Sequence, residues 1–452
     1  MQTATRLLVR RPRLTARTLL VAQVSAIAAI GLCTVFRFPV FAAVDERAHL
    51  AYVQEVAEDG RMPWVGRNHV FWQELAIEAR TYPRASGLDP ARLGLRGSSY
   101  EGWQPPLYYV LAAPAFEIPG DYRHKVYAVR AFDLLLLGAS VALVTLLARA
   151  VFEDDWIAPC CAALLPPLWP GVLVRSITTS NVALEMPIVP LYLLAIWHAT
   201  RRSRPSLLLA AGGLLGLCLL TQLTLLCLAP LLLPPLRAHL RARRDAAGVM
   251  TLAAAVALPL VLVAPWLGLN ESRYGALTAG AIEERITAGY LPPGPHGGLG
   301  AVLAGVQRFG HALLPQEWWP EYRGTAGIAL IALVVLPLLA LAPLLARPRL
   351  ARELPVLVLG SPLLLGLATL IAIMLAEHWS AALFPRYLSP MIAPFVLCGV
   401  WLWRRRTTGV PHLWILRGGA MYGTALTLVW IYLAGAPYFV HLGAHFGIRA
   451  AA

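Results

Sequence analysis

The chain has 452 residues, of which 58% are hydrophobic and only 14% charged. This composition is too apolar for a water-soluble domain and predicts an all-α polytopic membrane protein. The formal net charge of +14 does not indicate nucleic-acid binding, because the arginines cluster at the ends of apolar segments. The six cysteines lie in apolar runs without metal-ligand spacing, which favours membrane-packed residues over a disulfide framework.

The first apolar segment, Leu19–Phe36, follows a basic N-terminal stretch, Met1–Arg17. A signal peptide has a similar start, but no small-residue cleavage site precedes the acidic residues that come next. We therefore expect a retained transmembrane helix with its arginines in the cytoplasm. Its far end would bring the chain to the outer face of the membrane near Asp45.

Two adjacent carboxylates and a histidine follow at this membrane boundary: Asp45, Glu46 and His49. In a helix, Asp45 and His49 lie one turn apart on one face, and Glu46 is rotated by about 100° from Asp45. A carboxylate here suits proton removal from a hydroxyl, or cation binding. Acids at a helix start also complement the helix dipole, which is the alternative interpretation. We favour the functional one, because perturbed carboxylates cluster at functional sites.

Residues 42–105 form an outer loop that is long for a connection and is therefore predicted to be functional. The apolar spacing in Arg67–Arg80 predicts a short interfacial helix. Pro106 can open the helix that leads back to the bilayer, and Tyr108 and Tyr109 suit the interfacial aromatic belt. The loop adds two candidate substrate-binding residues at membrane-surface height, Glu101 and Gln104, and the start of the next helix adds Tyr108.

Ten further apolar segments give a total of about eleven transmembrane helices, some of them shorter than the usual ~20 residues. They are Ala128–Ala148, Ile157–Val174, Val182–Trp197, Ser206–Leu220, Leu223–Leu236, Gly248–Leu267, Thr325–Leu345, Leu354–Leu375, Tyr387–Trp403 and Gly418–Val440. We expect residues 1–452 to form a single integral membrane domain.

The arginine clusters fall on alternate connections, as the positive-inside rule requires of cytoplasmic loops. The clusters are Arg201–Arg204, Arg237–Arg244, Arg347–Arg352 and Arg404–Arg406. An odd number of spans then leaves the C-terminus outside, together with the loops 42–105 and 270–324. The second loop carries an aromatic and acidic patch, Gln316–Tyr322, which could cover a saccharide or lipid head group or belong to an ordinary interfacial belt.

Charged residues within the predicted spans are further candidates. Arg130 and Asp133 lie three residues apart and could neutralise each other. Arg175 precedes a row of hydroxyl side chains that ends at Asn181. For Arg175 the planar guanidinium suits lipid phosphate, and snorkelling to the interface is the alternative.

A second arginine, Arg386, lies next to Tyr387 at the outer end of a late span. Pro385 and Pro390 flank it, so the helix is interrupted on both sides. A charge near the bilayer is costly, which favours phosphate binding as strongly as snorkelling for this residue.

Three motifs resemble those of the bacterial GT-C membrane glycosyltransferases related to protein mannosyltransferases and lipid A aminoarabinose transferases. Asp45-Glu46-Arg47-Ala48-His49, with Tyr52-Val53-Gln54, resembles the signature of that family's first outer loop. Gln104-Pro105-Pro106-Leu107-Tyr108-Tyr109 is similar to its His/Gln-Pro-Pro-Leu element. Pro385-Arg386-Tyr387-Leu388-Ser389-Pro390 is similar to its late Arg-Tyr-Leu-x-Pro element. The motifs cover about a tenth of the chain and are specific only in combination.

The resemblance implies transfer of a sugar, with inversion, from a polyprenyl-phosphate donor to an acceptor hydroxyl on the outer face of a bacterial cytoplasmic (inner) membrane. Asp45 matches the candidate general base, Glu46 the adjacent acid, and Arg386 the residue that would neutralise the leaving phosphate. The resemblance leaves open whether a divalent cation takes part in the reaction. The other residues expected to bind substrate are His49, Glu101, Gln104, Tyr108, Arg175, Asn181 and Tyr387.

Two other function classes fit parts of the pattern. A transporter or flippase of a lipid-linked or small-molecule substrate would explain Arg130 and Asp133, but it predicts titratable groups deep in the bundle, and no matched pair of broken helices is evident. A zinc hydrolase would need more ligands, since Asp45, Glu46 and His49 lack the His-Glu-x-x-His order. The expected partners are membrane lipids, the lipid-linked donor, and an acceptor that is a glycan, a protein, a lipid or a secreted metabolite.

Overall fold

The computed structural model describes residues 2–38, 40, 45–65, 101–168, 170–278, 300, 336–377 and 387–406. Within these ranges every regular element is a helix, and the chain is a multi-pass membrane protein, as the composition predicts. Four sequence predictions lie outside the described residues: the interfacial helix Arg67–Arg80, the patch Gln316–Tyr322, Arg386, and the span Gly418–Val440.

Six helices of the described chain are long and apolar enough to cross a membrane. They are Ala16–Phe36, Tyr122–Asp155, Val182–Arg202, Leu223–Ala242, Ala246–Tyr274 and Val356–Ile373. Three shorter apolar helices accompany them: Leu107–Phe116, Pro205–Thr221 and Pro337–Ala346. Each of these six overlaps a span predicted from hydropathy, which confirms the all-α polytopic architecture.

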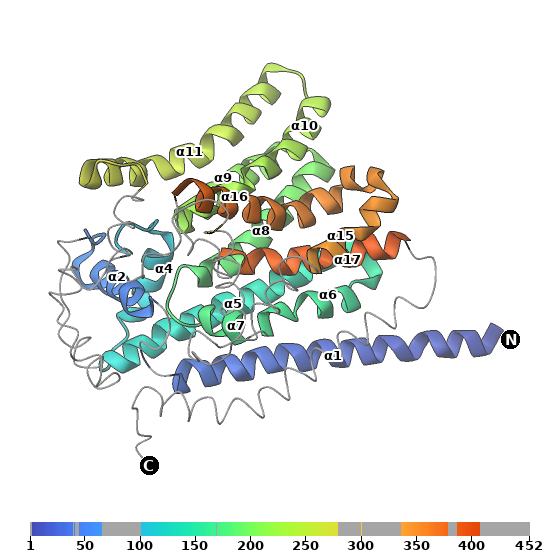
Figure 1. Cartoon of the computed structure of the whole chain (residues 1–452), viewed down its shortest axis with the longest axis horizontal. Coiled ribbons are helices and arrows are strands. Elements are labelled where there is room, and N and C mark those ends of the chain that lie inside the picture. Colours follow the sequence, from blue (N-terminus) through green and yellow to red (C-terminus); the bar gives the residue numbers. More distant parts are fainter. Residues whose placement is uncertain are drawn as a thin grey trace, which may run out of the picture.

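The described part of the bundle contains, in chain order, α1 (Gln2–Arg37), α5 (Tyr122–Phe152), α8 (Val182–Arg202), α9 (Pro205–Thr221), α10 (Leu233–Ala242), α11 (Ala246–Tyr274), α15 (Leu336–Ala346), α16 (Ser361–Glu377) and α17 (Ser389–Arg406). Helix α1 lies along one side of the bundle beside α5, and its N-terminal part extends past the other helices (Figure 1). A large buried apolar cluster from α5, α8, α9 and α17 forms the core.

The predicted continuous span Ile157–Val174 is wrong. The structure divides it into α6 (Ile157–Ala163), a 3₁₀ turn (Pro166–Leu168) and α7 (Pro170–Arg175). Prolines cause these breaks, because each lacks a backbone N–H and clashes with the preceding turn. The predicted span Leu223–Leu236 falls within the candidate span Leu223–Ala242, which begins as a 3₁₀ segment, Leu223–Leu232, and continues into α10.

Helices α9 and α11 approach each other closely through glycine. A Cβ on Gly212 would collide with the backbone carbonyl of Ala255, and one on Gly216 would lie 3.0 Å from the Cα of Pro259. Gly212 and Gly216 form a small-xxx-small pattern, which permits backbone contact between membrane helices. This contact fixes the end of α9 relative to α11.

Two short helices, α2 (Glu46–Asp59) and α4 (Leu107–Phe116), pack together at the end of the bundle away from the N-terminus (Figure 1). Helix α2 ends at Gly60, whose left-handed backbone (φ 63°) lets its N–H donate to the carbonyl of Val56. Buried apolar side chains, including Leu50, Val53 and Phe116, join α2 to α4 and α5. The candidate site lies at this end.

The opposite end of the bundle gathers arginines. Arg404 forms an ion pair with Asp155, and Arg405 lies 3.8 Å from the carboxylate of Glu353. Arg347 also donates to the carbonyl of Arg405 at 2.9 Å. This separation of an arginine-rich end from the end with α2 and α4 agrees with the charge alternation in the sequence.

Candidate functional site

Asp45 stands immediately before α2 in a left-handed backbone conformation, with φ 63° and ψ −2°. Such a conformation costs roughly 1–2 kcal/mol for a residue with a Cβ, and aspartate is one of the few residues that adopt it. The amide of His49 donates to the carbonyl of Asp45 at 3.0 Å, which confirms the predicted one-turn relationship. The Asp45 side chain makes no capping hydrogen bond to the helix.

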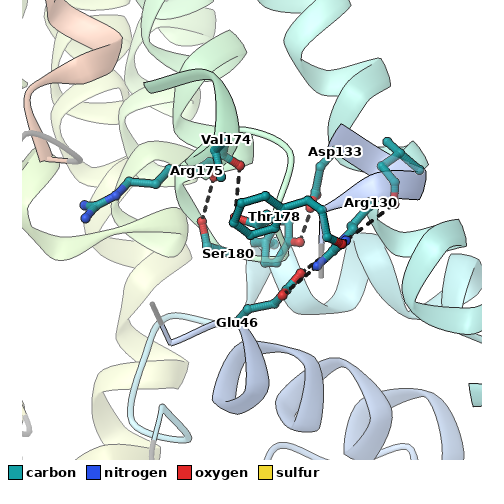
Figure 2. Close-up of polar contacts among 10 residues, drawn as sticks. Glu46, Arg130, Asp133, Val174, Arg175, Thr178 and Ser180 are labelled. Carbon is teal, nitrogen blue, oxygen red and sulfur yellow. Dashed lines mark hydrogen bonds and ion pairs between the residues drawn. The ribbon is translucent and has the colours of Figure 1, made fainter. Parts of the chain in front are cut away.

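Glu46, the next residue, forms a bidentate ion pair with Arg130 of α5 (Figure 2). Arg130 Nε lies 2.7 Å from Glu46 Oε1 and Nη2 lies 2.8 Å from Oε2, and both side chains are completely buried. The sequence spacing had indicated that Arg130 and Asp133 neutralise each other. The structure corrects this, because the bidentate partner of Arg130 comes from a different helix.

Asp133 accepts a hydrogen bond of 2.8 Å from the hydroxyl of Tyr108 on α4. Both side chains are fully buried, so Tyr108 belongs to the protein core. The prediction that Tyr108 and Tyr109 join an interfacial aromatic belt is therefore wrong, because Tyr109 is also fully buried. A buried tyrosine hydroxyl requires a partner, and Asp133 supplies it.

His49 and two tyrosines form a buried stack between α2 and α4. His49 Nδ1 lies 2.8 Å from the hydroxyl of Tyr109, and the rings of Tyr52 and Tyr109 stack at 3.7 Å between centroids. The Tyr52 hydroxyl donates to the carbonyl of Gln104 at 3.3 Å. Burial raises the pKa of the Tyr52 hydroxyl above its usual value.

Three predicted site residues, Glu101, Gln104 and Asn181, meet in a buried polar cluster. Gln104 Nε2 donates to Glu101 Oε2 at 3.0 Å, and Asn181 Nδ2 lies 3.5 Å from Gln104 Oε1. Asn181 Nδ2 also donates to Gln222 Oε1 at 2.5 Å. Sequence analysis missed Gln222. Its only signal is its position between two predicted spans, 206–220 and 223–236, as a polar residue in an apolar run.

Arg175 and Tyr387 lie apart from that cluster. Arg175 ends α7, is partly buried, and points away from Glu46 and Arg130 (Figure 2). Its backbone carbonyl accepts a hydrogen bond from Ser180 Oγ at 3.4 Å. Tyr387 precedes α17 and is buried in the main apolar cluster.

The C-terminal end of α11 holds both described ends of the first outer loop. Arg273 Nη1 donates to the carbonyl of Pro63 at 2.9 Å, and its guanidinium lies over the ring of Trp64. Asn270 Nδ2 lies 3.4 Å from the carbonyl of Trp103, just before Gln104. These contacts hold the loop ends against the membrane helices.

Within the described ranges, no group of three or more histidine, cysteine, aspartate or glutamate side chains is placed to hold a metal ion.

Comparison with solved structures identifies the fold. ArnT from Cupriavidus metallidurans in the apo state matches with a TM-score of 0.50 and 18% identity, over 91% of this chain and 63% of that chain. The chain has the GT-C fold. At this identity the likeness concerns the fold alone, and the chain spans 63% of the length of ArnT. The fold resemblance expected from the three motifs is confirmed.

Two further structures match less closely. ArnT bound to undecaprenyl phosphate gives a TM-score of 0.49 at 17% identity, over 91% of this chain and 63% of that chain. The Archaeoglobus fulgidus oligosaccharyltransferase, in complex with zinc and sulfate, gives a TM-score of 0.45 at 16% identity, over 94% of this chain and 53% of that chain. No protein-family model and no curated protein matches the sequence.

Proposed function

We propose that this chain is a glycosyltransferase that moves a sugar from a polyprenyl-phosphate donor to an acceptor hydroxyl, with inversion. The reaction takes place at the outer face of a bacterial cytoplasmic membrane, with the N-terminus inside. The observation that carries the proposal is Asp45. It is an acid in a strained backbone conformation directly before α2, and it lies in a GT-C fold at the end of the bundle opposite the arginine clusters. Strained residues of this kind occur preferentially at functional sites.

Asp45 is assigned the role of general base. Its carboxylate takes the proton of the acceptor hydroxyl while the acceptor oxygen forms a bond to the anomeric carbon of the sugar. The bond between that carbon and the phosphate oxygen breaks, and the polyprenyl phosphate leaves with the bonding electron pair. Arg175 and Arg386 are assigned to the phosphate, where positive charge stabilises the developing negative charge.

The polar cluster is assigned the role of binding the hydroxyl groups of the sugar and the acceptor. Glu101, Gln104 and Asn181 supply amide and carboxylate groups, which match the donors and acceptors of hydroxyl groups. His49 and Tyr108 are assigned to holding α2, α4 and α5 together through Tyr109 and Asp133. Tyr387 is assigned to the packing next to Arg386.

A protein with this fold supports the choice of donor, since ArnT has been crystallised with undecaprenyl phosphate. The motif resemblance points to the same class of donor. The acceptor class stays open between a glycan, a protein, a lipid and a secreted metabolite.

The test is transfer from radiolabelled undecaprenyl-phosphate-linked pentose, hexose and amino sugar by the purified protein, with acceptors of all four classes. We expect one donor to release undecaprenyl phosphate in step with labelling of one acceptor, and Asp45→Asn to abolish both. Folded protein that releases no undecaprenyl phosphate from any donor would contradict the proposal.

A further inference from the structure

We infer that Glu46 and Arg130 are positioning residues that fix the backbone of Asp45, and that Glu46 is not itself a base. The sequence motif treats Asp45 and Glu46 as a pair of acids, but the structure gives them different surroundings. The effect of these two residues on turnover rests on the proposed function. The structural part of the inference, the hold on residue 45, can be measured without substrate.

Both oxygens of the Glu46 carboxylate accept a hydrogen bond from Arg130. Arg130 donates to Oε1 at 2.7 Å and to Oε2 at 2.8 Å, and neither side chain is exposed. A planar guanidinium and a carboxylate in this arrangement form two parallel charge-assisted hydrogen bonds. To accept a proton from a substrate, Glu46 would have to break this pair within a buried environment and strand the arginine charge.

The other edge of Arg130 binds the end of α1. Nη1 donates to the carbonyl of Phe38 at 2.7 Å and lies 3.4 Å from the carbonyl of Val35, and the guanidinium lies near the Phe38 ring. Carbonyls at a helix C-terminus lack partners within the helix and favour a positive charge. One arginine therefore binds Phe38, seven positions before Asp45, and also Glu46, the residue directly after it.

Asp45 lies between these two fixed points in the left-handed conformation. A non-glycine residue keeps such a conformation only where its surroundings determine it. The Glu46–Arg130 pair fixes the direction of α2 at its first residue, and the hydrogen bond from the His49 amide fixes the Asp45 carbonyl. Without the pair, residue 45 can relax to an ordinary conformation, which changes the direction of its side chain. A displacement of 1 Å in a reacting group can cost about 10²-fold in rate.

The test variants are Glu46→Gln and Arg130→Lys. Glu46→Gln keeps the shape but removes the charge, and Arg130→Lys keeps the charge but removes the fork that reaches both Glu46 oxygens and the Phe38 carbonyl. The matched control is Glu58→Gln on the same helix, where the carboxylate is partly exposed and lies 3.5 Å from Lys125. Each variant is measured for hydrogen–deuterium exchange in residues 45–53, for affinity for undecaprenyl phosphate, and for turnover.

We expect Glu46→Gln and Arg130→Lys to speed exchange at the start of α2 and to reduce kcat by about 10²-fold, with unchanged affinity for undecaprenyl phosphate. Glu58→Gln should match the wild type in all three measurements. In the Asp45→Asn background, adding Glu46→Gln should cause no further loss of turnover, because Glu46 acts through Asp45. A further loss there would mean that Glu46 has its own chemical role and would overturn the inference.

A double variant covers the case in which the single changes prevent folding. Glu46→Gln with Arg130→Gln leaves no buried charge without its partner, and should insert and fold. It should still show fast exchange and low kcat. Wild-type exchange and turnover in a folded pair variant would overturn the inference while leaving the proposed glycosyl transfer intact. Full turnover by Asp45→Asn would instead contradict the proposed function, and the exchange result would still report on the pair.

Discussion

Asn181 and Gln222 are joined by a short hydrogen bond, 2.5 Å from Asn181 Nδ2 to Gln222 Oε1, between the start of α8 and the end of α9. The same Asn181 amide lies 3.3 Å from the carbonyl of Thr221 and 3.5 Å from Gln104 Oε1. Gln222 has an extended backbone, φ −158° and ψ 127°, which separates α9 from the following 3₁₀ segment. One buried amide thus holds three segments of the candidate site together.

The variant Gln222→Leu tests this connection. It leaves the buried Asn181 amide with poorer partners, so the free energy of unfolding should fall by about 1–3 kcal/mol and turnover should fall as well. Gln23→Leu is the matched control, because Gln23 is also a buried amide but binds the carbonyl of Cys161, away from this cluster. It should reduce stability without changing KM or kcat. Thermal unfolding in detergent and the transfer assay measure both quantities.

The paired variant Asn181→Leu/Gln222→Leu separates stability from function. Replacing both partners with apolar groups can be nearly neutral for stability. Stability should therefore recover in part, since Thr221 and Gln104 still lose the Asn181 donor, while transfer stays low. Recovered transfer would mean that the two amides serve only to hold α8 against α9.

Hydropathy predicted where the apolar helices lie, because a membrane helix requires a long apolar run whatever its partners are. It did not predict that Ile157–Val174 is broken, since proline is compatible with an apolar run but not with an unbroken backbone ladder. No feature of the sequence predicted the left-handed conformation of Asp45.

Side-chain partners were less predictable than helices. Arg130 and Asp133 lie three residues apart, yet the bidentate partner of Arg130 is Glu46, 84 positions away in the chain. Local spacing shows which groups can meet on one helix, whereas the packing of α2 against α4 and α5 decides which groups do meet. Gln222 was missed for the same reason, because only the fold brings it to Asn181.

Membrane topology can be tested with single cysteines. We expect a cysteine at Gly87 to react with an impermeant thiol reagent in intact cells, and one at Arg202 to react only after permeabilisation. The native cysteines should contribute little background, since five of the six are buried and Cys33 lies on the first span. Protection at position 87 in intact cells would place the proposed site on the wrong side of the membrane.

The close contact between α9 and α11 predicts a strong packing effect. Gly212→Leu would force a side chain into the backbone of Ala255, and should reduce stability by several kcal/mol or prevent folding. Gly268→Ala on α11 is the control, because nothing lies within 4 Å of the added Cβ. Thermal unfolding should be normal for Gly268→Ala. Equal stability of the two variants would contradict the helix contact.

The proposed phosphate ligands can be separated by charge and shape. Arg386→Lys and Arg175→Lys keep a positive charge but lose bidentate geometry, and the alanine variants lose both. Affinity for undecaprenyl phosphate should therefore fall in the order arginine, lysine, alanine at both positions, with turnover following. Arg123→Ala, at an exposed arginine near the start of α5, is the control for net charge. If all four variants bind like Arg123→Ala, both arginines only interact with the membrane interface.

The substitution Asp45→Asn isolates the proposed base from its backbone. Asparagine tolerates the left-handed conformation as aspartate does, so the start of α2 should keep its geometry and stability should change less than with alanine at this position. Turnover should fall by about 10²–10⁴-fold, because the amide cannot accept the proton of the acceptor hydroxyl. Affinity for undecaprenyl phosphate should be unchanged, since the phosphate is assigned to arginines on other segments.

A second variant at the same position gives the comparison. Asp45→Ala also removes the carboxylate, but alanine bears the full cost of the left-handed backbone, roughly 1–2 kcal/mol. It should therefore lose turnover as Asp45→Asn does and lose stability in addition. If Asp45→Asn instead keeps full turnover, the carboxylate has no chemical role, and the strained backbone at residue 45 serves only to turn the chain into α2.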